Sequence, residues 1–124
     1  MLREGSQGAV ETEAGIGGEA PRVLACVSCR RAITDTAKRI AKDGSHAHTF
    51  VNPDNETFEI GCFSDAAGLL RLGPSSMEAT WFAGFSWQSE VCGGCRGYLG
   101  WLYRRGDERF HGLILAALIE IDED

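Results

Sequence analysis

Two short stretches, Cys26–Cys29 (CVSC) and Cys92–Cys95 (CGGC), decide the fold of this chain. A Cys-x-x-Cys turn directs two thiolates into one small volume, and two such turns complete a tetrahedral sulfur shell around Zn²⁺. The two glycines of the second turn are expected to adopt the positive φ angles of tight metal turns. We therefore predict one structural zinc per chain, which folds the domain without catalysing a reaction. Its predicted ligands are Cys26, Cys29, Cys92 and Cys95.

Disulfides and redox dithiols are the alternatives for these cysteines. The first twenty residues lack the basic and apolar regions of a secretion signal, which disfavours structural disulfides. One metal site is also a simpler use of four cysteines than two separate dithiols. The fifth cysteine, Cys62, lies in FEIGCFS among alternating apolar residues, so we predict a buried structural thiol.

Length and composition favour one folded domain with acidic ends. The 124 residues are 44% hydrophobic and carry a net charge of −6. Residues 1–21, rich in Gly and Glu, are predicted to be a disordered tail, and residues 22–124 the domain. Residues 22–119 have eleven basic and ten acidic side chains. This balance predicts neither a nucleic-acid nor a membrane partner, and without a targeting segment we expect a cytoplasmic protein.

Short apolar and β-branched runs between turn signals predict an all-β fold. The Asp43-Gly44 pair indicates a hairpin turn within a segment, 36–44, that is a short strand or a turn. We interpret residues 65–79 as a loop-rich connection. Residues 109–121 fit a strand or a helix, and we favour a strand that bends near Gly112. The other expected strands are 22–29, 45–52, 56–64 and 98–105.

The stretch TWFAGFSW at residues 80–87 holds two of the three tryptophans, and Trp101 follows the second cysteine pair. A zinc turn between Trp87 and Trp101 would tether both segments to one rigid point. This arrangement favours a preformed aromatic box, although core packing is the ordinary use of large aromatics. Such a box binds either a cation or a neutral ring. Glu78 and Glu90 lie close enough in sequence to assist a cation, and exposure to solvent is the alternative for both.

The combination of both cysteine pairs with FVNP, TWFAGFSW and GWLY resembles the cereblon-type thalidomide-binding (CULT) domain, and in particular its stand-alone bacterial versions. The resemblance runs from about residue 23 to residue 121. It implies two antiparallel sheets pinned together at the zinc, a fold called a β-tent. It also implies a small-molecule binding module for a cyclic imide, such as a glutarimide or succinimide. C-terminal cyclic imides and uridine-like rings are candidate natural ligands.

The resemblance also implies which residues bind the ligand. The tryptophans would form a cage with Tyr103 at its base, under a loop that contains Asn52 and Pro53, and Phe58 would add to it. The imide would bond to the backbone of residues 79–81, where Ala79 replaces a histidine of the eukaryotic family. The chain has no counterpart of the protease-like domain and adaptor-binding region of eukaryotic cereblon, so no ubiquitin-ligase adaptor is expected. The implied set is Asn52, Pro53, Phe58, Ala79, Trp81, Trp87, Trp101 and Tyr103.

Two alternatives of other classes remain open. A methyl-lysine reader would use the same box for a quaternary ammonium group. A methionine sulfoxide reductase of the B type would need a reactive thiolate, and Cys62 is its one candidate, with no Arg or His beside it to lower its pKa. His46 and His48 form an H-x-H pair that could hold a second metal, but no acidic partner lies near them in the sequence.

Overall fold

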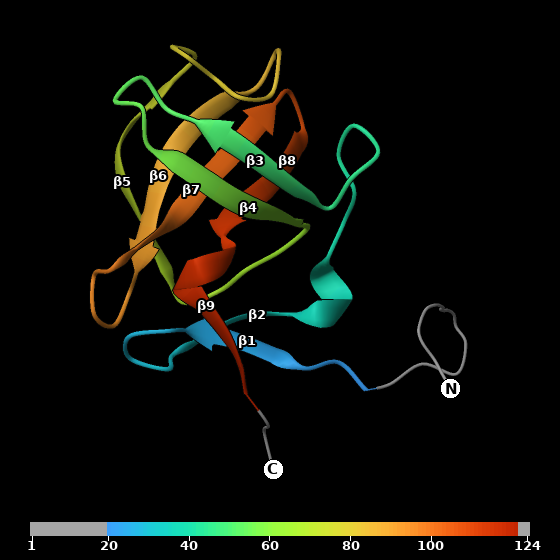
Figure 1. Cartoon of the computed structure of the whole chain (residues 1–124), viewed down its shortest axis with the longest axis vertical. Helices are drawn as coiled ribbons and strands as arrows, with labels where there is room; N and C mark the ends of the chain where they lie inside the picture. Colours follow the sequence, from blue (N-terminus) through green and yellow to red (C-terminus); the bar gives the residue numbers. More distant parts are fainter. Residues whose placement is uncertain (1–19, 122–124) are drawn as a thin grey trace.

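The computed structural model describes residues 20–121. Residues 1–19, nearly all of the predicted tail, lie outside this described part, as do residues 122–124. The described chain is all-β, with two antiparallel sheets and two single-turn 3₁₀ helices, which confirms the fold class predicted from the sequence (Figure 1). No helix within residues 20–121 is long and apolar enough to cross a lipid bilayer.

The two sheets differ in size and lie at opposite ends of the molecule (Figure 1). The small sheet has the order β2-β1-β9, with β1 Val23–Cys26, β2 Ala32–Asp35 and β9 Leu118–Ile121. The large sheet has the order β3-β4-β8-β7-β6-β5. Its strands are β3 Ala47–Val51, β4 Thr57–Phe63, β5 Leu69–Ser76, β6 Ser86–Cys92, β7 Tyr98–Arg105 and β8 Glu108–Ile114.

The turn predicted at Asp43-Gly44 forms in the segment between β2 and β3. Asp43 and Gly44 have φ angles of 53° and 87°, the signs of a type I′ turn, and Lys42 pairs with Ser45 across them. The hairpin signal at this dipeptide is therefore confirmed. Residues 36–44 otherwise form a 3₁₀ turn, η1 (Thr36–Lys38), whose Ala37 N–H is capped by the Asp35 carboxylate at 2.8 Å.

Two apolar clusters hold the sheets in place. One lies where the sheets meet and takes residues from both, namely Leu24, Cys26, Ile33, Phe63, Cys92, Leu99 and Leu113. The other involves the large sheet and the aromatic segment 80–87, with Ile60, Cys62, Phe82, Phe85, Trp101, Tyr103 and Phe110. The second cluster therefore fixes the aromatic segment against the large sheet.

The interpretation of residues 65–79 as a loop-rich connection is wrong in part. Leu69–Ser76 form β5, which pairs with β6 from Leu69↔Cys92 to Ser76↔Trp87. The pairing is irregular between Leu72 and Ser76, where Gly73 and Pro74 lie. A proline is tolerated there because β5 is an edge strand and needs no second ladder partner.

The expected bend near Gly112 is also wrong. Gly112 lies within β8 and pairs with Cys62 on one side and Trp101 on the other. The chain turns instead at the 3₁₀ turn η2 (Leu115–Ala117) and then enters the small sheet as β9. The apolar run therefore serves both sheets, which explains why it lacks a single period.

Candidate metal centre and aromatic cavity

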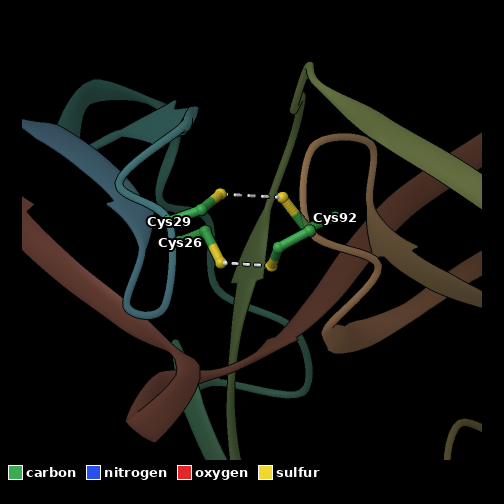
Figure 2. Close-up of side chains that lie close together, drawn as sticks. Cys26, Cys29 and Cys92 are labelled. Atoms are coloured by element: carbon green, nitrogen blue, oxygen red, sulfur yellow. Dashed lines mark hydrogen bonds between the residues drawn. The ribbon is translucent and has the colours of Figure 1, made fainter.

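The four cysteines of the two Cys-x-x-Cys turns meet at one point between the sheets (Figure 2). Their sulfur atoms all lie within 4.8 Å of one another, with 3.7 Å between Cys26 and Cys95 and 3.5 Å between Cys29 and Cys92. A tetrahedral zinc shell with Zn–S bonds of about 2.3 Å has sulfur–sulfur edges of about 3.8 Å. The four sulfur atoms therefore fit a zinc ion. The cluster joins the end of β1 to the β6–β7 turn.

The two turns have the same backbone geometry. The Arg30 N–H donates to the Cys26 carbonyl at 2.8 Å, and the Arg96 N–H donates to the Cys92 carbonyl at 2.9 Å. Arg30 and Arg96 have φ angles of 66° and 68°. The positive φ angles therefore follow each turn and do not fall on the CGGC glycines, contrary to the expectation.

Gly93 instead permits a close approach of the turn to the backbone of Gly68. A Cβ on Gly93 would lie 3.0 Å from the Gly68 carbonyl oxygen, and a Cβ on Gly94 would lie 3.4 Å from the Cys29 sulfur. The Gly94 N–H also points at the Cys92 sulfur at 3.3 Å. A side chain at position 93 would press on the Gly68 carbonyl, whereas a Cβ at position 94 would make ordinary contact with the cluster.

The thiol pKa values of Cys92 and Cys29 shift in opposite directions within the cluster. Burial opposes ionisation of Cys92, but backbone N–H groups of Cys95 and Gly94 outweigh it and lower the pKa of Cys92 to about 7. The backbone N–H of Arg31 favours the Cys29 thiolate, but the contact with Cys92 and desolvation raise the Cys29 pKa to about 11. The Cys29–Cys92 contact thus keeps a proton that a divalent cation would displace.

A cavity of about 470 Å³ opens on one face of the large sheet. All eight residues that the resemblance implied lie around it, and their role in binding stays a prediction. Its complete lining is Asn52, Pro53, Glu56, Phe58, Glu78, Ala79, Trp81, Trp87, Ser89, Tyr98, Trp101 and Tyr103.

The indole rings form the walls of this cavity. Trp81 and Trp101 meet edge to face, with ring centroids 4.9 Å apart and an interplanar angle of 74°. Phe58 packs against Trp101 in the same way at 5.6 Å. The Trp87 Nε1–H donates to the Glu78 carbonyl at 2.8 Å, which fixes the orientation of that ring. These contacts restrict the rings, as a preformed site requires.

The sheet and the aromatic segment position these rings. Trp87 pairs with Tyr103 and Ser89 pairs with Trp101 across β6 and β7, so these four side chains share one face of the sheet. The aromatic side chains of residues 80–87 have two roles. Phe82 and Phe85, which are 3% and 4% exposed, anchor the segment in the core. Trp81 is partly buried and faces the cavity.

The segment that leads into Trp81 leaves backbone polar groups open. The N–H and C=O of Ala79 and the N–H of Trp81 make no hydrogen bond with the described residues. Ala79 also has a φ of 55°, which is costly for a residue with a Cβ. A strained backbone with one free acceptor and two free donors thus borders the indole walls.

Asn52 folds the loop at the cavity edge. Its side-chain oxygen accepts the Glu56 N–H at 2.8 Å, and its amide donates to the Glu56 carboxylate at 2.9 Å. The turn is closed further by the Asn52 N–H, which donates to the Glu56 carbonyl at 2.9 Å. Pro53 and Glu56 are held beside the aromatic walls by these bonds.

Three further residues line the cavity without having been predicted from the sequence, namely Glu56, Ser89 and Tyr98. Ser89 follows Trp87 by two positions, so strand alternation could have placed it on the same face. Tyr98 precedes Trp101 by three, and alternation would have placed it on the opposite face. The register shift between Glu90 and Val91 reverses this parity and brings Tyr98 to the cavity.

Three other candidates lie elsewhere. Glu90 is on the opposite face of β6, where its carboxylate bonds to His111. His46 and His48 each donate to a backbone carbonyl, of Ile40 at 3.1 Å and of Ser45 at 2.9 Å. Among the described residues, the cysteine cluster is the one group of three or more ligands close enough for a metal, so the histidine pair is not part of such a site.

Cys62 lies in the core beneath the cavity, as the sequence predicted. Its side chain is 0% exposed, and burial raises the pKa of its thiol to about 11. A neutral, enclosed thiol is a poor nucleophile at pH 7, which disfavours the reductase alternative.

No family model matches this chain. It is similar to cereblon. The protein cereblon of Xenopus tropicalis is 34% identical over 74 aligned residues, which cover 56% of this chain and 17% of that relative. Together with the four-cysteine cluster, this similarity supports a cereblon-like module.

We expect Cys62→Ser to leave ligand binding unchanged and to lower the free energy of unfolding by about 1–3 kcal/mol, because a hydroxyl would replace a thiol in an apolar site. Chemical denaturation would measure the stability, and a sulfoxide-reduction assay would test the thiol chemistry. Wild-type reduction of methionine sulfoxide that Cys62→Ser abolishes would favour the enzyme alternative instead.

Proposed function

We propose that this chain is a binding module, stabilised by one structural zinc ion, that holds a cyclic imide in the aromatic cavity. One observation carries the proposal: unpaired backbone groups at Ala79 and Trp81 border the walls formed by the tryptophan indoles. A binding site of this kind combines apolar walls with a few well-placed polar groups. No covalent step is part of the proposal.

An imide matches these groups in kind and number. Its N–H is flanked by two carbonyls, so it offers one donor between two acceptors. We assign the imide N–H to the Ala79 carbonyl and an imide carbonyl to the Trp81 N–H. Each bond made in a dry cavity contributes about 1 kcal/mol. The saturated edge of a glutarimide or succinimide ring would lie against the indoles, where burial contributes about 25 cal/mol per Å².

The similarity to cereblon supports a small-molecule ligand, and the sequence resemblance to thalidomide-binding domains supports the imide class. The described residues also supply the structural element of such domains, the four-thiolate cluster. In this proposal zinc fixes the β6–β7 turn and thereby the spacing of Trp87 and Trp101. The proposed contact residues remain those that the sequence resemblance implied.

A quaternary ammonium ligand is the second candidate. Glu56 and Glu78 both line the aromatic cavity, so a cation would meet carboxylates as well as ring faces. The Glu56 carboxylate already accepts from Asn52, however, and the open Ala79 and Trp81 groups would then have no partner. The imide uses more of the polar groups at the site.

We expect a glutarimide-bearing small molecule to quench tryptophan fluorescence with micromolar affinity, about −7 to −8 kcal/mol. Trp101→Ala should lose most of this affinity, because Trp101 packs against Phe58 and Trp81 and forms one wall. Leu72→Ala is the matched control, since Leu72 is 57% exposed and lies outside the cavity. Full affinity in folded, zinc-loaded Trp101→Ala would place the ligand elsewhere.

A further inference from the structure

A second cavity, of about 390 Å³, lies on the other face of the large sheet. Ser89 lines the aromatic cavity and Glu90, its neighbour on β6, lines this one, as alternation along a strand requires. Residues from β5, β6, β8 and the segment before β5 surround it. They are Asp65, Ala66, Ala67, Gly68, Leu69, Leu70, Arg71, Glu90, Arg109 and His111.

The cavity contains a buried polar pair. Glu90 and His111 are 1% and 7% exposed, and the Nδ1 of His111 lies 2.7 Å from a carboxylate oxygen of Glu90. Glu90 is on β6 and His111 is on β8, so their side chains meet over the strand between them, β7. The residue of β7 that pairs with Glu90 is Gly100. A Cβ at Gly100 would meet the Gly112 carbonyl oxygen at 2.1 Å, so no side chain can stand there.

The bond to Glu90 leaves one nitrogen of His111 available. Nδ1 donates to the carboxylate, which fixes the ring. Nε2 has no hydrogen-bond partner among the described residues. It is not among the fully buried unpaired atoms, so part of its surface stays accessible. Because His111 lines the cavity and is otherwise buried, Nε2 has access to a ligand there.

Two arginines complete the lining. Arg71 is the cross-strand neighbour of Glu90, and Arg109 precedes His111 by two positions on β8, so both share its face. Neither guanidinium makes a hydrogen bond or an ion pair with the described residues. Asp65, also in the lining, already accepts the Ala66 N–H at 3.0 Å.

We propose that this second cavity binds a small molecule through a carboxylate or phosphate group, held by Arg71, Arg109 and the free nitrogen of His111. Guanidinium groups match the planar oxygens of such anions and bind them in pairs of hydrogen bonds. Nε2 adds a third contact, since it accepts from a protonated oxygen or, as imidazolium, donates to an anionic one. Glu90 is a positioning residue that orients the ring.

The test is a titration of the full chain, followed by NMR signals of backbone amides and of the His111 ring. Inorganic phosphate and acetate are the two probes, at constant ionic strength set with NaCl because screening alters weak charge contacts. We expect saturable shifts around β5 and β8 with a dissociation constant in the millimolar range. The stronger probe identifies the anionic group as phosphate or carboxylate.

Three variants decide whether the site is specific. Arg71→Gln and Arg109→Gln should each weaken binding by roughly tenfold, because each removes one guanidinium from an otherwise unchanged, exposed position. Arg104→Gln is the matched control, since Arg104 on β7 pairs with Arg109 on β8 but lies outside the cavity. Equal losses in all three variants, or shifts with both probes that never saturate, would overturn the proposal.

The imide proposal and this one fail separately. A glutarimide-bearing ligand should bind Arg71→Gln with wild-type affinity, because the two cavities lie on opposite faces of the sheet. Loss of anion binding with retained imide binding would therefore count only against the second cavity.

Discussion

Cys92→Ser is expected to leave the protein largely unfolded and without zinc. Cys92 is 0% exposed, and it belongs both to the sulfur cluster and to the apolar cluster where the sheets meet. Structural zinc contributes about 10–16 kcal/mol in zinc-finger peptides, which matches or exceeds the whole stability of a typical domain. Metal analysis with circular dichroism would measure both losses, and wild-type protein should contain one Zn²⁺ per chain.

Cys62→Ser is the matched control for this experiment. It makes the same chemical change at another fully buried cysteine that lies outside the cluster. Its zinc content should equal that of the wild type. Wild-type protein that is folded but contains no zinc, or a folded Cys92→Ser protein, would end the account of a metal-dependent fold.

Local patterns predicted much of this molecule. The meeting of the four cysteines follows from two short motifs, because each turn fixes two sulfurs and the pairs complement each other. The Asp43-Gly44 hairpin and most strands also follow from local rules. The sheet partners of each strand did not follow, since pairing joins residues far apart in the sequence.

The features that were predicted wrongly or missed from the sequence have physical causes. Gly73-Pro74 indicated a loop, but an edge strand accommodates both residues in an irregular stretch of pairing. The run at residues 109–121 hides a change of sheet at η2, which no periodicity could reveal. The Glu90–His111 pair crosses an intervening strand, so it depends on Gly100 and on the register of three strands together.

Methylation of the imide nitrogen is expected to abolish binding to the aromatic cavity. It removes the ligand's only donor and leaves the Ala79 carbonyl without a partner, which costs about 1–3 kcal/mol in a dry site. The added methyl group also occupies the space where the backbone must approach. The combined loss should exceed about a hundredfold in affinity. A trimethylammonium compound should bind weakly or not at all, because a quaternary ammonium group has neither a donor nor an acceptor for the open backbone groups of Ala79 and Trp81.

The most direct test is calorimetric titration of zinc-loaded wild-type protein with glutarimide, N-methylglutarimide and tetramethylammonium under identical conditions. We predict measurable heat and a saturable isotherm for glutarimide alone. Equal binding of the N-methylated imide, or tighter binding of the quaternary ammonium, would contradict this prediction. The cavity would then recognise ring shape or charge, and cyclic-imide binding through Ala79 and Trp81 would be wrong even with the fold unchanged.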